Sequence, residues 1–270
     1  MSALTLFHNT YRSTAANPDA VPELVLLHGW GLHSIVWDGL MPALLERFQV
    51  TVVDLPGMGQ SPNPNGEYTL EFIAEWVAKI LPSQCHLLGW SLGGQVALKL
   101  AEQFPDKVRS VIGLCGNPKF VASEHWPGLP DALLARFAEM YEEDREGTLV
   151  RFLALNCKDA PTIREDTRQL KDILYFCGLP DPRALRGGLT ILREADLSGL
   201  LATLTVPVAF LFGEHDNLVP QALSEHLAKN FPQIPQQVMP EVSHVPFISA
   251  PDNTAAALMQ LWQTLGVLHG

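Results

Sequence analysis

The sequence has few cysteines and no long uninterrupted apolar run. Its four cysteines are Cys85, Cys115, Cys157 and Cys177, and none of them form the C-x-x-C spacing typical of zinc and redox sites. We therefore expect no zinc site, and buried or free thiols in a reducing compartment. No stretch reaches the roughly 18 apolar residues that a membrane-spanning helix needs, and the first residues lack the features of a signal peptide. We expect a soluble cytoplasmic protein that acts as a monomer.

Positive charge is also scarce. The 270 residues include 18 Lys and Arg against 29 Asp and Glu, which gives a formal net charge of −11. Because binding to nucleic acid depends largely on cationic contacts to phosphates, this balance argues against general nucleic-acid binding. Because the chain is negatively charged overall, an acidic partner could bind only at a local basic patch. With 47% hydrophobic and 17% charged residues, the chain can form a substantial core and suits one α/β domain with an insertion.

Five short, continuous apolar runs indicate the strands of a parallel sheet. They cover residues 24–29, 49–57, 85–91, 108–116 and 206–216. Continuous runs, unlike alternating ones, suit strands that are buried on both faces. Helical patterns at 68–81 and 95–104 separate several of these runs. The order predicts a doubly wound, mostly parallel α/β sheet.

The strand–helix alternation is interrupted between residues 117 and 189. This stretch contains helical patterns, such as those at 131–144 and 147–155, with Pro and Gly between them and no strand-like run. We expect a helical cap at 117–189. The sheet core is then formed by residues 1–116 and 190–270.

A serine between glycines follows the third apolar run. Gly89-Trp90-Ser91-Leu92-Gly93 fits the G-x-S-x-G pattern, in which a sharp strand-to-helix turn lifts the serine hydroxyl above the sheet. Side chains at the two glycine positions would crowd such a turn. A glycine-rich turn with an incidental serine is the structural alternative. The position between a buried run and a helix pattern favours a nucleophile.

A serine nucleophile needs a base to remove its proton and an acid to hold that base in the right tautomer. Asp216 ends the last strong run, at the sheet edge where open α/β folds place their sites. His244 precedes a C-terminal helix pattern at 253–265. Alone, Asp216 could cap a helix and His244 could be structural. In the chain order Ser, Asp, His they predict a catalytic triad, whereas Asp196 lies in a polar lead-in to a helix.

The stretch His28-Gly29-Trp30-Gly31 predicts an oxyanion loop. We expect the main-chain N–H groups of Trp30 and Leu92 to be its two donors. The Trp30 indole is expected to line the substrate pocket, although a purely structural tryptophan is the alternative. We expect His28 to brace this loop and Asp54 to shape the loop at 54–61.

These motifs resemble the α/β-hydrolase superfamily along nearly the whole chain, through LLHGWG, VDLPGMGQS, GWSLGG, FGEHD and SHVPFISAP. More narrowly, WPG, RFLAL, GGLTIL and PFIS resemble the carboxylesterases of biotin synthesis, the pimeloyl-[acyl-carrier protein] methyl ester esterases. The resemblance implies an α/β-hydrolase fold and a serine esterase without metal or cofactor. It also implies a substrate, the methyl ester of a pimeloyl chain carried on acyl carrier protein.

The resemblance further implies roles for individual residues. Ser91 is the nucleophile, His244 the general base and acid, and Asp216 its orienting acid. Leu92 contacts substrate as well as the oxyanion, and Phe152 corresponds to a pocket residue of the cap.

The family's cap also carries arginines that contact the carrier protein. Arg151, Arg164 and Arg168 match them by position. Where the family pattern can carry a further arginine, this chain has Gly147, with Arg145 nearby as a substitute.

The spacing of Arg164, Arg168 and Lys171 agrees with a binding role, because these residues share one helical face that could meet an acidic partner. Interleaved acidic residues make an ordinary solvated helix face the alternative.

Other functions are compatible with the same triad. A general short-chain carboxylesterase or thioesterase is the nearest alternative, and a carbon–carbon bond hydrolase is more distant. Ser91 argues against a haloalkane dehalogenase, which uses a carboxylate nucleophile. A ligand-binding protein on a hydrolase fold is the alternative of another class, and turnover of a nitrophenyl ester would exclude it. No sequence feature distinguishes a methyl ester from a thioester.

Overall fold

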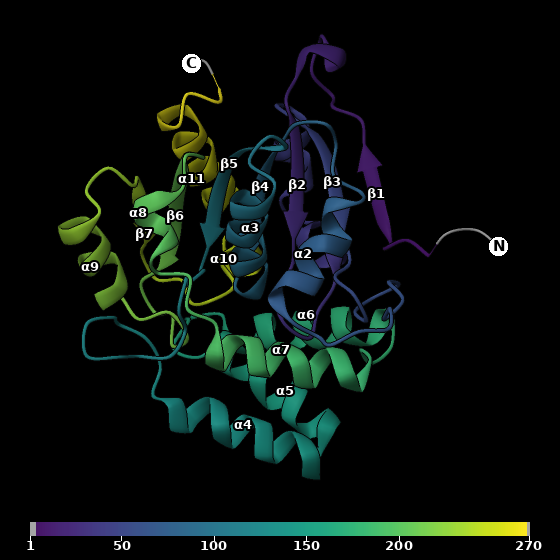
Figure 1. The fold of residues 1–270 in the computed structure, drawn as a ribbon, viewed down its shortest axis with the longest axis vertical. Helices are drawn as coiled ribbons and strands as arrows, with labels where there is room; N and C mark the ends of the chain where they lie inside the picture. The colour runs from purple at the N-terminus through teal and green to yellow at the C-terminus, as the bar shows by residue number, and fades with distance from the viewer. Residues whose placement is uncertain (1–3, 269–270) are drawn as a thin grey trace.

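The computed structural model describes residues 4–268, which form a seven-stranded sheet with helices packed against it and a helical cap at one edge (Figure 1). The strands are β1 (His8–Tyr11), β2 (Glu23–Leu27), β3 (Gln49–Val53), β4 (Cys85–Trp90), β5 (Val108–Leu114), β6 (Val208–Gly213) and β7 (Gln236–Met239). Their order in the sheet is β1-β3-β2-β4-β5-β6-β7. Among the strand pairs within residues 4–268, only that of β1 with β3 is antiparallel. The predicted doubly wound, mostly parallel sheet is thus confirmed.

The sheet core is completed by helices that alternate with the strands. They are η1 (Pro18–Ala20), η2 (Ser34–Trp37), α1 (Met41–Leu45), α2 (Leu70–Ala78), α3 (Leu92–Gln103), α8 (Leu200–Thr203), α9 (Ala222–Asn230), α10 (Pro246–Ser249) and α11 (Pro251–Thr264). Every residue of β6 is buried, and so are the last four residues of both β2 and β3. Apolar runs of this kind form central strands because both of their faces are covered.

Between β5 and β6 the chain forms four cap helices. They are α4 (Asp131–Glu143), α5 (Arg145–Asn156), α6 (Ile163–Phe176) and α7 (Pro182–Glu194). Figure 1 shows them below the carboxyl end of β5, at one end of the strands. Helix α7 continues past residue 189 to Glu194, so the expected end of the cap falls inside a helix.

The strand order places a topological switch point between β2 and β4. The chain runs from β2 outward to β3 and then crosses to β4, on the other side of β2. Leu27 at the end of β2 is in register with Gly89 near the end of β4. Loops at the carboxyl ends of such strands diverge and leave room for a site. The predicted oxyanion loop and the Ser91 turn both start here.

The four cysteines are free thiols, three of them buried and Cys177 half-buried. Within residues 4–268, no helix combines the length and the apolar character needed to cross a membrane.

Candidate active site

Ser91 occupies the sharp turn between β4 and α3. Its backbone has φ 54° and ψ −119°, a conformation that residues with a side chain rarely adopt. Glycine is needed on both sides of it. A Cβ at Gly89 would lie 2.2 Å from the carbonyl oxygen of Gly93, and a Cβ at Gly93 would lie 2.1 Å from that of Leu27. The glycine pattern therefore encodes this turn through steric necessity.

His244 and Asp216 form a buried pair. Nδ1 of His244 lies 2.7 Å from Oδ2 of Asp216, and neither side chain is exposed. The other carboxylate oxygen, Oδ1, accepts hydrogen bonds from the main-chain N–H groups of Leu218 (2.8 Å) and Val219 (2.9 Å). Because these bonds fix the carboxylate, Asp216 can hold the imidazole with its proton on Nδ1 and leave Nε2 as an acceptor.

The second nitrogen of His244 is available for proton transfer. Nε2 is buried and has no hydrogen-bond partner among residues 4–268. The indole of Trp90, next to Ser91, donates a 2.8 Å hydrogen bond to the carbonyl oxygen of His244, which ties the histidine loop to the serine strand. The Ser91 hydroxyl does not cap α3. Contacts between nucleophile and base often tighten only when substrate binds.

The loop after β2 carries Trp30, and His28 holds this loop in place. Nε2 of His28 accepts a hydrogen bond from the N–H of Leu55 at 2.9 Å, so Nδ1 carries the proton and donates to the carbonyl oxygen of Gly29 at 2.8 Å. Burial lowers the pKa of His28 to about 4, which keeps the ring neutral. Leu92 is the first residue of α3, and N–H groups of a first turn have no partner inside their helix.

Two other acidic side chains are bonded elsewhere. Asp54 accepts hydrogen bonds from the N–H groups of Ser34 (2.7 Å) and Gln60 (2.9 Å), so it shapes its loop as expected. Asp196 pairs with Lys119 at 2.8 Å and bonds to Ser198. Asp216 is thus the carboxylate that meets His244.

Trp30 connects the core to the cap. Its indole N–H donates to the carbonyl oxygen of Leu185 in α7 at 2.8 Å. Its ring packs edge-on against Phe152 of α5, with 4.8 Å between centroids. A Cβ at Gly188 would lie 2.5 Å from the Trp30 ring. The cap therefore rests directly on the predicted oxyanion loop.

The cap also contacts the loop of His244 through Asn156, the last residue of α5. The Asn156 carbonyl oxygen accepts hydrogen bonds from the N–H of His244 (3.1 Å) and the hydroxyl of Ser243 (2.8 Å). The Asn156 side chain donates to the carbonyl oxygen of Phe152 at 2.6 Å. Sequence patterns could not reveal this contact, because a main-chain carbonyl makes it and 87 positions separate Asn156 from Ser243.

Serine, histidine and aspartate in this arrangement can carry out acyl transfer. The imidazole takes the serine proton during attack on an acyl carbon, the carboxylate stabilises the imidazolium, and main-chain N–H groups stabilise the oxyanion.

Known proteins are similar to this chain over most of its length. The family described as "alpha/beta hydrolase fold" matches residues 22–251. The pimeloyl-[acyl-carrier protein] methyl ester esterase of Aeromonas hydrophila is 45% identical over 231 residues, which cover 85% of this chain and 91% of that protein. That of Methylococcus capsulatus is 42% identical over 234 residues, which cover 87% and 92%. The chain belongs to this esterase family of α/β-hydrolases.

Solved α/β-hydrolase structures agree with the fold of this family member. An esterase from Thermogutta terrifontis superposes with a TM-score of 0.79 at 23% identity, covering 96% of this chain and 93% of that one. A bromoperoxidase from Bacillus anthracis reaches 0.83 at 20% identity, covering 96% and 95%. At this identity the likeness supports the fold alone.

The predicted carrier-protein arginines of this α/β-hydrolase lie on two neighbouring cap helices. Arg164 and Arg168 are exposed on α6. Arg151 is exposed on α5 and lies 3.4 Å from Asp144, which is itself half-exposed. Helices α5 and α6 pack together, and Tyr175 of α6 donates a 2.6 Å hydrogen bond to Glu146 of α5.

Gly147 has a structural explanation. Its N–H donates to Oδ1 of Asp144 at 2.9 Å and so helps to cap α5. A Cβ at this position would lie 1.9 Å from Oδ2 of the same carboxylate. The possible substitute Arg145 is placed 6.0 Å from the centre of the Tyr141 ring.

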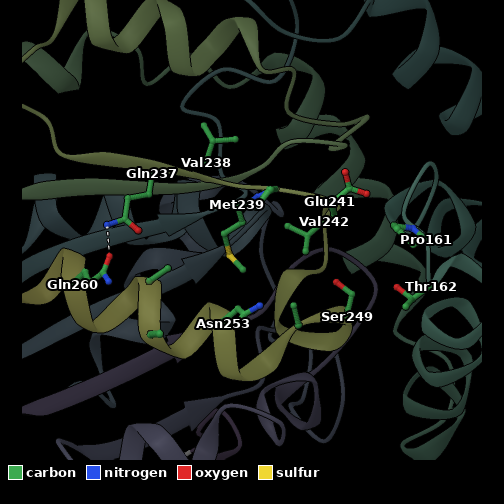
Figure 2. A pocket seen from close by; sticks show the side chains of 14 residues that line it. Pro161, Thr162, Gln237, Val238, Met239, Glu241, Val242, Ser249, Asn253 and Gln260 are labelled. Atoms are coloured by element: carbon green, nitrogen blue, oxygen red, sulfur yellow. Dashed lines mark hydrogen bonds between the residues drawn. The ribbon is translucent and has the colours of Figure 1, made fainter.

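Figure 2 shows a surface cleft, which has a volume of about 540 Å³. It is bordered by β7, by α11 as far as Gln260 and by the cap residues Pro161 and Thr162. Gln237 and Gln260 are hydrogen-bonded to one another at its rim. None of the triad residues lines it. Ser91 itself is only 3% exposed.

Proposed function

We propose that this chain hydrolyses the methyl ester of a pimeloyl group carried on acyl carrier protein, a reaction of biotin synthesis. Two relatives named for this activity are 42% and 45% identical to the chain over most of both lengths. The observation that carries the chemistry is the buried 2.7 Å contact between His244 and Asp216. The hydrogen bond from Trp90 to the His244 carbonyl oxygen ties this pair to the strained turn at Ser91.

In this mechanism each residue has one task. Ser91 attacks the ester carbonyl while Nε2 of His244 takes its proton, and the same nitrogen then gives this proton to the methoxide oxygen as the C–O bond breaks, which releases methanol. Asp216 keeps the proton of the neutral imidazole on Nδ1. The N–H groups of Trp30 and Leu92 stabilise the oxyanion, and water finally releases the acyl group from Ser91.

The proposed partner, an acyl carrier protein, would bind to α6. At 100° per residue, Arg164, Arg168 and Lys171 fall within an arc of about 60°. Together with Ile163 and Thr167 they line a surface groove of about 450 Å³. Asp166 is buried and bonded to Thr162, so it does not compete on this face.

Arg151 adds to this basic face from α5, the neighbouring helix. Its contact with Asp144 is exposed to solvent on both sides, and such pairs are weak. A carrier protein rich in acidic groups could therefore displace Asp144 at little cost. Phe152 follows Arg151 on α5 but is buried against Trp30. In this proposal α5 contacts the carrier protein through Arg151 and the acyl chain through Phe152.

The test is hydrolysis of methyl pimeloyl-acyl carrier protein by the purified chain, with Ser91→Ala as the inactive control and free dimethyl pimelate and p-nitrophenyl butyrate as comparison substrates. We expect the carrier-bound ester to have the highest kcat/KM. Rapid cleavage of butyrate without cleavage of the carrier-bound ester would instead indicate a general short-chain esterase, and a preference for acyl thioesters would indicate a thioesterase.

A further inference from the structure

Cys115 is a buried thiol beside the Asp216–His244 pair. It directly follows β5, has a left-handed backbone (φ 44°) and is not exposed. Its Sγ lies 3.8 Å from the carbonyl oxygen of Ser243. The Sγ atom, a carboxylate oxygen of Asp216 and a ring nitrogen of His244 all lie within 4.8 Å of one another. Three kinds of donor atom therefore meet at one buried point.

Thiolate, imidazole and carboxylate are the donors that thiophilic divalent cations use in proteins. Tetrahedral bonds of about 2.0 to 2.3 Å to one ion place its ligand atoms roughly 3.3 to 3.8 Å apart. The Nδ1–Oδ2 pair, now at 2.7 Å, therefore has to open as the ion enters, and the Sγ atom completes the site. The nitrogen that faces Asp216 is Nδ1 of His244. The donors come from the ends of β5 and β6 and from the loop after β7, which explains why sequence spacing did not reveal the cluster.

We propose that a thiophilic divalent cation binds between Sγ of Cys115 and Nδ1 of His244, with Asp216 as a third ligand, and thereby switches the esterase off. The inference rests on the roles proposed above for His244 and Asp216. The thiol releases its proton to solvent as the metal–sulfur bond forms. The Nδ1 proton of the neutral imidazole is replaced by the cation and moves to Nε2.

A proton on Nε2 removes the acceptor that Ser91 needs. The hydrogen bond from Nδ1 to Asp216 is lost in the same step, so the imidazole is held in the wrong tautomer. Without the cation, burial first and the charge of Asp216 second raise the pKa of the Cys115 thiol well above its usual value. The free protein thus keeps a neutral thiol there, and a bound dication supplies the charge that stabilises the thiolate.

The experiment uses HgCl₂ as the probe. Cys177, the half-buried cysteine, would react first, so the background is Cys177→Ala. One equivalent of Hg²⁺ should lower the kcat of this variant on p-nitrophenyl butyrate by at least about 100-fold, since the wrong tautomer of a serine triad costs about 10⁴. Excess dithiothreitol should restore it. Adding Cys115→Ala, or Cys115→Ser if alanine destabilises the protein, should abolish the inhibition.

The matched control is Cys157→Ala in the same background, because Cys157 is equally buried and should give no protection. A second readout is the downfield proton resonance of His244 Nδ1–H, which one equivalent of Hg²⁺ should remove unless Cys115 is replaced. Equal inhibition with and without Cys115 overturns the proposal, as does an Nδ1 proton that persists in the inhibited enzyme or no inhibition at all. If the chain cleaves no ester, the proposed function fails, but the proton resonance still tests the cation site.

Discussion

A Cβ atom on Gly93 would lie 2.1 Å from the carbonyl oxygen of Leu27. The close approach of α3 to the end of β2 holds the Ser91 turn against the oxyanion loop. We expect Gly93→Ala to lower the free energy of unfolding by several kcal/mol, at the upper end of the range of about 0.5 to 5 kcal/mol for single substitutions. Urea unfolding followed by circular dichroism measures it.

The matched control is Gly199→Ala. In the described part of the chain, no atom lies within 4 Å of a Cβ at this position, and its φ of −63° suits alanine. We expect no loss, and at best a gain of about 0.4 to 1 kcal/mol. Equal losses for the two variants would mean that the contact at Gly93 can relax.

Ser91→Ala should lower kcat on every ester by at least about three orders of magnitude, because the nucleophile and its base act as a unit. The fold should not change, since the Ser91 hydroxyl caps no helix. Steady-state kinetics and circular dichroism on the same sample check both points. Turnover near that of the unmodified protein would exclude the serine mechanism.

Asp216→Asn should lower kcat by about 10⁴, because the amide supports the wrong tautomer of His244. Asp196→Asn should leave kcat nearly unchanged, since Asp196 is bonded to Lys119 and Ser198. Kinetics on p-nitrophenyl butyrate separates the two. If Asp196→Asn were the more damaging substitution, the assignment of the acid would be wrong.

Reversing the charges of Arg164 and Arg168 to Glu should raise KM for the carrier-bound ester and leave cleavage of a small soluble ester almost unchanged. Charges at an exposed rim act mainly on association and are screened over about 8 Å at physiological ionic strength. Added salt should therefore raise KM for the carrier-bound ester in the unmodified protein.

Arg136→Glu is the control for this experiment, because Arg136 is exposed on α4 rather than on α6. We expect KM for the carrier-bound ester to rise in the double variant and to stay near that of the unmodified protein in Arg136→Glu. An equal effect on both substrates, or on neither, would remove the support that these arginines give to a carrier-protein substrate.

The free energy of unfolding should decrease as the pH falls from about 6.5 toward 4, in part because of His28. Burial lowers the pKa of His28 from 6.5 to about 4, so in this window the unfolded chain binds a proton that the native protein does not. The contribution of His28 to the free energy of unfolding is complete above pH 6.5. Below that pH it is lost at about 1.4 kcal/mol per pH unit. Urea unfolding at several pH values measures the slope.

His28→Gln should make this slope shallower, although the variant is less stable at neutral pH because the bond from Leu55 is altered. His125→Gln, at an exposed side chain, should keep the original slope. Identical slopes in the unmodified protein and the His28 variant would contradict the role of His28.

The sequence predicted the central sheet well because its buried strands are continuous apolar runs. Strand β1 was not expected, since all four of its residues are exposed and edge strands need no apolar run. The pairing of Asp216 with His244 was predicted from motif order, and the structure confirms the contact. Motif order can therefore predict contacts between side chains whose roles in the motif are known.

Contacts outside these motifs could not be predicted. Asn156 meets the histidine loop through a main-chain oxygen, which any residue type could supply. Cys115 reaches the triad only because β5 and β6 are neighbours in the sheet. In each case the determinant is tertiary packing rather than local sequence.

The bond between the Asn156 carbonyl oxygen and the His244 N–H couples access to the site with chemistry at the site. Ser91 is only 3% exposed, so movement of the cap would widen access of an acyl chain to it. A displacement of α5 large enough to admit the chain would also free the loop that carries the base. With the cap displaced, Ser91 would be accessible, but the loop that positions His244 would not be held. Hydrolysis would therefore follow closure of the cap over the bound chain. An ester that holds the cap closed would therefore be hydrolysed faster than an equally reactive ester that does not.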